Sequence, residues 1–208
     1  MKGLLLKDYY QMIKNCKMFF LFDIVFLAVS FVSKGNFLMF LGFPVMFSGI
    51  LPLTLLSFDE REGWSGYCGT LPFSEKQIVS AKFLFGLIAQ LVTAAVVAVI
   101  VFVQSLIYPE RDFLEFLLVV GVMFIASLVF PALCLPFCYK FGTEKGRIAY
   151  LLIIAITCGG MPLYGNIVDY FERYGSTDKI FLLVLAGIIA VYIISWLISI
   201  PLLKSNKK

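Results

Sequence analysis

Long stretches without any charged residue constrain this chain more than any other feature of its sequence. A helix that crosses a bilayer needs about 20 apolar residues, because the hydrocarbon core is about 30 Å thick and each helical residue rises about 1.5 Å. Five uncharged stretches are long enough, and they cover residues 35–58, 83–109, 116–139, 148–168 and 180–203. The sequence therefore predicts an all-α integral membrane protein in which residues 1–208 form a single transmembrane domain.

A sixth stretch, residues 18–33, is shorter and contains Asp23, so the distribution of positive charge has to decide whether it spans. With six spans, 13 of the 17 lysines and arginines lie on the side of both termini and 4 lie on the other side. Without the first span the two numbers become 9 and 8. Because Lys and Arg collect on the cytoplasmic side of membrane proteins, we predict six transmembrane helices in the cell membrane with both termini in the cytoplasm.

Composition excludes several kinds of chemistry. Hydrophobic residues make up 61% of the chain and charged residues 14%, and there is no histidine. A Ser-His-Asp site or a zinc site built on imidazole is therefore impossible. The chain also has no phosphate-binding loop of the G-x-x-x-x-G-K-[ST] type. We expect no catalytic residue, no metal site and no cofactor in this chain, and we expect its five cysteines to be small apolar side chains.

The first 17 residues have the pattern of an amphipathic helix. Apolar side chains recur at helical spacing on one face: Leu5, Tyr9, Met12, Ile13 and Cys16. Polar side chains occupy the opposite face: Lys7, Asp8, Gln11, Lys14 and Asn15. Such a helix buries its apolar stripe at the lipid headgroups while its lysines meet anionic lipid. It is expected either to anchor the chain or to bend into the first span and pack against its neighbours.

The loop between spans two and three, residues 58–82, is the longest hydrophilic segment. It begins with four charged residues, 59–62, followed by Gly63 and Trp64. We predict a short helix near residues 59–69 and a turn, and then span three, with Ser74 as its N-cap and Gln77 at the capping-box position. Aromatic residues among charges favour a docking surface for a partner protein. A solvated loop with its aromatics at headgroup level is the alternative.

Two features interrupt the predicted spans. Asp23 is the only charged residue inside them, and it lies either at the hydrated boundary or in a pathway. Residues 159–162, Gly-Gly-Met-Pro, break the fifth span, and irregular backbone at that depth is tolerated only beside protein or a wet cavity. We therefore treat Asp23, Gly159, Gly160 and Pro162 as candidate gate or pathway residues. Residues 164–178 are expected to form an extracellular segment.

Three segments resemble one family of membrane proteins. They are the opening Leu5-Leu6-Lys7-Asp8, the charged residues that lead to Gly63 and Trp64, and residues 70–79, which read Thr-Leu-Pro-Phe-Ser-Glu-Lys-Gln-Ile-Val and precede Lys82. Together with the six-span topology they resemble the ABC-2 type transporter permeases. The likeness is to the small six-span permeases such as the membrane subunit of the phenol-soluble-modulin exporter of staphylococci.

This resemblance implies a half-transporter that pairs with a second copy or a related permease. Separate ABC ATPase subunits would bind ATP and Mg and would dock beneath the membrane domain. The N-terminal elbow helix would use Lys7, Asp8 and Lys14. The coupling helix and the turn into span three would supply the docking residues: Asp59, Glu60, Arg61, Glu62, Gly63, Trp64, Tyr67, Leu71, Pro72, Phe73 and Ser74. The resemblance also implies export of amphipathic peptides, antibiotics or lipids.

Three other functions remain open at the level of sequence. The substrate-binding subunit of a vitamin importer is a six-span protein of similar length, but it lacks a long aromatic and charged second loop. A secondary carrier or a channel would be expected to show inverted repeats and charges within the spans. An intramembrane enzyme would need paired polar groups, and Asp23 stands alone. The sequence suggests no nucleic-acid partner.

Overall fold

A computed structural model describes residues 2–32, 37–68, 70–107, 113–146, 148, 151–152 and 177–206. These residues form α-helices joined by short turns. The helices are α1 (Lys2–Asn15), α2 (Lys17–Val32), α3 (Phe37–Ser48), α4 (Leu51–Arg61), α5 (Trp64–Cys68), α6 (Glu75–Ile107), α7 (Phe113–Ser127), α8 (Val129–Phe141) and α10 (Thr177–Asn206).

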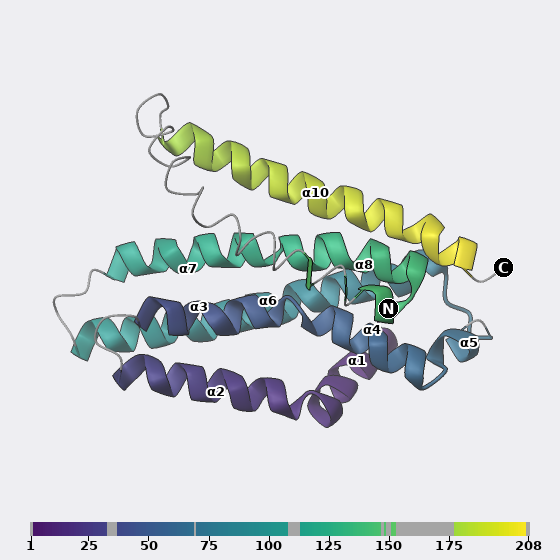
Figure 1. The fold of residues 1–208 in the computed structure, drawn as a ribbon, viewed down its shortest axis with the longest axis horizontal. Helices are drawn as coiled ribbons and strands as arrows, with labels where there is room; N and C mark the ends of the chain where they lie inside the picture. Colours follow the sequence, from purple (N-terminus) through teal and green to yellow (C-terminus); the bar gives the residue numbers. More distant parts are fainter. Residues whose placement is uncertain are drawn as a thin grey trace.

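The long helices run side by side along the longest axis of the molecule (Figure 1). Helix α6 lies at the centre and packs against α3, α7 and α10. Helix α5, the start of α1 and the end of α10 gather at one end of the bundle, which we call the α5 end (Figure 1). The end of α6 and the start of α7 lie at the opposite end.

Within the described residues, three helical segments are long and apolar enough to cross a membrane: Glu75–Ile107, Val120–Phe141 and Leu185–Lys204. Two bent pairs would raise the number to five if each pair is one span. Helices α1 and α2 meet at 69°, and the segments Phe40–Ser48 and Leu51–Arg61 meet at 41°. The predicted fifth span, with Gly159, Gly160 and Pro162, falls almost entirely outside the described residues, as does nearly all of the 164–178 segment. Six spans therefore remain a prediction.

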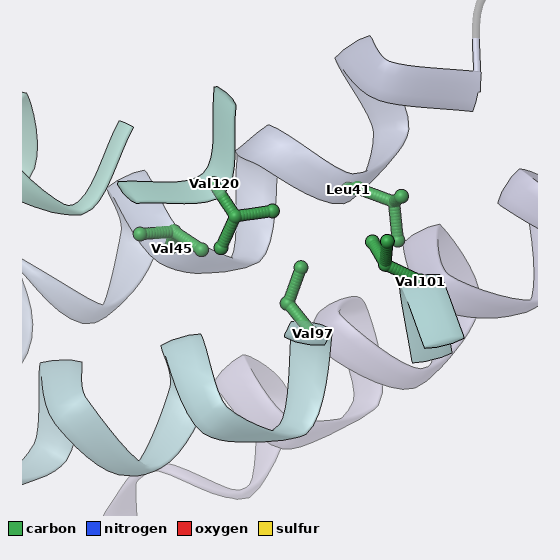
Figure 2. Packing of buried hydrophobic residues seen from close by; sticks show 5 residues of the cluster. All are labelled: Leu41, Val45, Val97, Val101 and Val120. Atoms are coloured by element: carbon green, nitrogen blue, oxygen red, sulfur yellow. The ribbon is translucent and has the colours of Figure 1, made fainter. Parts of the chain in front are cut away.

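One apolar cluster holds α3, α6 and α7 together toward the end opposite α5. Leu41 and Val45 of α3, Val97 and Val101 of α6 and Val120 of α7 are buried and point toward one another (Figure 2). Valine side chains have a single preferred rotamer in a helix, so little freedom is lost when they pack. This cluster gives the bundle a tightly packed half against which the α5 end is positioned.

The break between α7 and α8 has a proline as its cause. Pro131 has no backbone N–H, so the carbonyl of Ser127, four residues earlier, has no helical donor. The side-chain amide of Gln90 on α6 donates to that carbonyl at 3.0 Å. Pro136 leaves the carbonyl of Ala132 in the same position, and the hydroxyl of Ser195 on α10 donates to it. Both backbone carbonyls that the prolines of α8 leave without a helical donor thus accept a hydrogen bond from a neighbouring helix, as backbone in lipid requires.

Two glycines allow close approaches around the bend between α3 and α4. A Cβ atom at Gly86 of α6 would lie 2.5 Å from Cγ of Pro52 on α4, so a larger residue would force these two helices apart. A Cβ atom at Gly49, in the bend itself, would lie 2.9 Å from the amide nitrogen of Gln90. The bend in this predicted span therefore lies directly beside the first proline break.

Candidate functional site

Four charged side chains form a closed ring at the α5 end, and we call it the four-charge cluster. It consists of Lys7 and Asp8 of α1, Asp59 of α4 and Lys82 of α6. The amine of Lys82 lies 2.7 Å from Asp8 Oδ1 and 2.7 Å from Asp59 Oδ2. The amine of Lys7 lies 2.6 Å from Asp59 Oδ1 and 3.2 Å from Asp8 Oδ1. The cluster ties the N-terminal helix to the end of α4 and to the start of α6.

Most of the cluster is buried. The side chains of Lys82 and Asp8 are 4% and 1% exposed, and that of Asp59 is 6% exposed. Each amine contacts two carboxylates and each carboxylate contacts two amines. Since two lysines face two aspartates, the ring has no net charge. A charge removed from water must be paired to be tolerated, and this arrangement pairs every one of the four.

The cluster continues into α5 through Lys7. Its amine lies 4.5 Å from the ring centre of Trp64, close enough for a cation–π interaction. The Trp64 ring in turn packs against Tyr67 with 5.6 Å between ring centres. A helix of five residues has little stability of its own. Its position therefore depends on its neighbours: Lys7 of α1, helix α4 and the surroundings of its buried Cys68.

Glu60 joins the end of α4 to the segment that follows α8. Its Oε2 atom accepts a hydrogen bond from the backbone N–H of Thr143 at 3.0 Å and another from the Thr143 hydroxyl. Gly142, with φ at +86°, ends α8 and turns the chain so that Thr143 meets Glu60. Residues far apart in the sequence are thereby held on the same end of the molecule.

The exposed part of this end is a surface of charged and aromatic groups, which we call the docking surface after the role that the sequence predicts for it. Its residues are Arg61, Glu62, Gly63 and Tyr67, all exposed, with Tyr67 at 59%. Gly63 separates α4 from α5 and has φ at +68°, a conformation that favours glycine. The helix expected over residues 59–69 is therefore two pieces: α4 reaches Arg61, and α5 begins at Trp64.

The structure separates residues that the sequence groups together. Asp59 is buried in the four-charge cluster and Trp64 and Phe73 are half-buried, whereas the sequence suggests exposed groups. Between α5 and α6, Pro72 and Ser74 are exposed and Leu71 is half-buried. The capping box is confirmed: the backbone N–H of Ser74 donates to the Gln77 side chain at 3.2 Å, and that of Gln77 donates to the Ser74 hydroxyl at 3.3 Å.

The polar face of α1 also differs from the expectation. Lys14 is exposed, but Asp8 and Gln11 are buried together with Leu4. On the apolar stripe, Tyr9 and Ile13 are 48% and 43% exposed, as side chains that face lipid must be, whereas Cys16 is buried. The polar side of this helix faces the protein because the ion pairs of Asp8 lie there.

The sequence pattern marks Lys82 only as the charge that bounds a span and does not assign it to the site. A usable signal exists in its spacing. Lys82, Gly86 and Gln90 follow one another at four-residue intervals, and all three are buried on one side of α6. Polar residues that share a helical face with a glycine, within an apolar stretch, indicate contact with protein and not with lipid.

A cavity of about 370 Å³ lies beside the cluster. It is bounded by α4, α5, α6, α8 and the end of α10, with Asp59, Lys82 and Trp64 among its lining residues. Across the part of the chain that the structure describes, no group of three or more Cys, Asp or Glu side chains is placed to hold a metal ion. The α5 end therefore combines exposed charged residues with a buried ion-pair cluster and a cavity beside it.

A bundle of long apolar helices with charged contacts gathered at one end defines a multi-pass membrane protein. The chain matches the family described as ABC-2 family transporter protein over residues 3–204, and it belongs to that family. Members of this family are permeases, the membrane subunits of ABC transporters, and the ATPase is a separate subunit. Neither the search of curated proteins nor that of solved structures found a match.

Proposed function

We propose that this chain is the permease subunit of an ABC exporter in the cell membrane. Two permeases, either two copies of this chain or this chain and a relative, form the translocation pathway. ATPase subunits bind at the docking surface in the cytoplasm, and ATP binding and hydrolysis there drive transport. The cargo class is amphipathic: peptides, antibiotics or lipid-like molecules.

The observation that carries this proposal is the connection of the docking surface to the helices. Exposed Arg61, Glu62 and Tyr67 lie beside Trp64, which contacts Lys7 and through it the four-charge cluster. A push on this surface is thereby applied to α1, α4 and α6 together. Transport requires that an ATPase movement be converted into repacking of spans, and rigid elements joined by ion pairs can transmit such a movement.

The bent helix pairs support the same function. The 69° bend between α1 and α2 and the 41° bend between α3 and α4 lie next to the elements that the cluster joins. Bends at the ends of packed elements are where hinge motions are absorbed. The first two spans are therefore the ones that we expect to move when the docking surface moves.

The test is recovery of an ATPase with the tagged chain from its own host in mild detergent. We expect a stoichiometric nucleotide-binding subunit of about 25–35 kDa, the size of one to two ordinary domains. The variants Trp64→Ala with Glu62→Arg, and Tyr67→Ala with Glu62→Arg, are expected to reduce its recovery while membrane insertion is unchanged. The second pair leaves Trp64 in place over Lys7, so a loss there does not come from removal of that cation–π contact.

Glu144→Arg is the matched control, because Glu144 is exposed in the segment that Glu60 contacts but lies outside the docking surface. It should leave the ATPase bound. Unchanged recovery in both docking-surface pairs would remove the coupling assignment. A wild-type chain that is purified alone, or only with copies of itself, in several detergents would contradict the transporter function as a whole.

A further inference from the structure

A second cavity, of about 190 Å³, lies among α1, α2, α6 and the bend between α3 and α4. Asp23 lines it, six residues after the start of α2 at Lys17. That separation corresponds to about 9 Å along a helix, so Asp23 lies less than two turns from the bend where α1 meets α2. The cavity is distinct from the one beside the four-charge cluster, and the two share no lining residue.

The carboxylate of Asp23 has an unused acceptor. Its Oδ1 atom is shielded from solvent and receives no hydrogen bond from the residues that the structure describes. No ion pair involves Asp23 in those residues, whereas Asp8 and Asp59 each contact two amines. A carboxylate inside an apolar stretch is costly unless a cation or water meets it. The geometry therefore leaves room for a positively charged group.

Two hydroxyl groups of the cavity, those of Ser48 and Thr93, present acceptors as well. The hydroxyl of Ser48 donates its hydrogen to the carbonyl of Val45 at 2.6 Å, and that of Thr93 donates to the carbonyl of Ala89 at 2.9 Å. Since each hydroxyl has only one hydrogen, what remains for a ligand is oxygen lone pairs. The Tyr9 phenol also lines the cavity and can donate, but the carboxylate of Asp23 and the oxygens of Ser48 and Thr93 outnumber it. A ligand rich in N–H donors therefore finds more partners here than an anionic ligand does.

Aromatic rings complete the lining. Tyr9 of α1, Phe19 and Phe20 of α2, Phe47 of α3 and Phe85 of α6 contribute to the wall. The faces of such rings attract ammonium groups, most strongly when water is excluded. On one side the lining includes two residues of α6 that are 43% and 58% exposed, Ile88 and Val92. An apolar chain could leave the cavity along these side chains.

We propose that this cavity binds the ammonium group of a cationic amphiphile, with Asp23 as its counter-ion and with the apolar chain extending along α6. The cavity volume suits an ammonium head and the first methylene groups of a chain. That such an amphiphile is a cargo rests on the proposed transport function, whereas its binding in this cavity does not. Binding itself is measured on the permease without any ATPase, so the two proposals fail separately.

The experiment uses a dodecylamine that carries a photoreactive diazirine on its chain. It is added to the purified full chain in maltoside micelles, which contain no ammonium group, and labelled peptides are identified by mass spectrometry. We expect labelling in α2 and α6, near Phe20 and Val92. Diazirine-bearing dodecanol and dodecyl sulfate of the same length should label these peptides at least about tenfold less, because hydrogen bonds to charged groups are the strong ones.

Asp23→Asn should reduce amine labelling at least about tenfold, and Asp23→Glu should retain most of it. Glu75→Gln, the same acid-to-amide change at the start of α6 outside the cavity, is the matched control. The comparison of the amine, alcohol and sulfate probes uses the wild-type chain, so it tests the proposal even if Asp23→Asn fails to fold. Equal labelling by the sulfate or the alcohol would overturn the proposal. Competition by phosphatidylethanolamine as effective as that by dodecylamine would overturn it too, because the cavity would then belong to bilayer lipid.

Discussion

At the scale of single residues, the four-charge cluster shows how a membrane-embedded chain can keep two lysines and two aspartates together. Burying two opposite charges is itself expensive, and a hydrophobic replacement of an entire pair is often tolerated. Loss of one member of a pair is different, because it leaves an uncompensated buried charge. The free energy of unfolding should therefore depend on whether the charges of the cluster balance more than on how many there are.

We predict that Lys82→Met lowers the free energy of unfolding by about 3–5 kcal/mol, the usual result of breaking a buried ion pair from one side. The double variant Asp8→Asn with Lys82→Met should recover part of that loss, since Lys7 and Asp59 remain as a neutral pair at 2.6 Å. Thermal unfolding followed by fluorescence-detected size exclusion measures both. A double variant less stable than Lys82→Met would mean that charge balance does not govern this site.

Lys7 provides the internal comparison for this prediction. Its side chain is 23% exposed, against 4% for Lys82, so water can partly solvate the charges left behind. Lys7→Met should therefore cost less stability than Lys82→Met in the same thermal unfolding measurement. Its main effect should be on the position of α5, because it also removes the cation over Trp64.

The members of this cluster can be named from the sequence in part, but their pairing cannot. The motifs identify Lys7, Asp8 and Asp59 as candidate site residues. The contacts join residues 52 and 74 positions apart, and no local pattern specifies such partners. The sequence does not assign Lys82 to the cluster, because a charge at the edge of an apolar stretch looks like an ordinary residue at the boundary of a span.

At the scale of helices, breaks in the spans are compensated by side chains of neighbouring helices. Gln90 and Ser195 donate to two backbone carbonyls, those of Ser127 and Ala132, which Pro131 and Pro136 leave without helical donors. An unpaired carbonyl in an apolar environment is costly. The two side chains therefore do more than contact their neighbours, because they replace missing backbone bonds.

We predict that Gln90→Leu destabilises the chain by about 1–3 kcal/mol, the cost of leaving a buried acceptor unpaired. In a Pro131→Ala background the same change should cost less, because the alanine supplies the backbone N–H that the Ser127 carbonyl otherwise lacks. Unfolding temperatures of the four proteins in this cycle measure the coupling. Equal losses in both backgrounds would show that Gln90 acts by packing alone. Ser195→Ala with Pro136→Ala gives an independent second cycle.

Helix starts and stops are predictable from the sequence to the extent that local chemistry sets them. Ser74 and Gln77 cap each other within a single turn, so the sequence predicts the start of α6 correctly. The bend within residues 35–58 lies where Pro52 opens α4 and has no backbone N–H for the Ser48 carbonyl, so the prolines of this stretch favour a kink there. The close approach of Gly49 to Gln90 of another helix is not specified by any local pattern. The division of the 59–69 helix depends on Gly63, whose positive φ the sequence permits but does not require.

At the scale of the whole molecule, contacts at the α5 end fix which helix ends lie together. Glu60 binds Thr143, and the amine of Lys76 lies 5.6 Å from the ring centre of Trp196. The ends of α4, α8 and α10 and the start of α6 therefore gather at one end of the bundle. Helix α10 begins at the other end (Figure 1). The crossing predicted between α8 and α10 lies almost entirely outside the described residues and stays a prediction.

The last prediction concerns the side of the membrane on which these ends lie. In the predicted six-span topology most lysines and arginines fall on the side of the α5 end, so we predict that this end is cytoplasmic. Single cysteines placed at Asp112 and Glu172 in a chain without its native cysteines should react with an impermeant maleimide added to intact cells. Cysteines at Arg61 and Lys145 should react only after the membrane is opened.

Positions 61 and 145 must behave alike in this experiment, because each lies within two residues of a partner in the hydrogen bond between Glu60 and Thr143. That bond holds the end of α4 and the segment after α8 at the same end of the bundle. Labelling of both positions from outside would invert the topology and place the docking surface beyond the reach of any cytoplasmic ATPase. Labelling of only one would contradict the fold itself, since no orientation of this bundle puts its two hydrogen-bonded segments on opposite sides of a membrane.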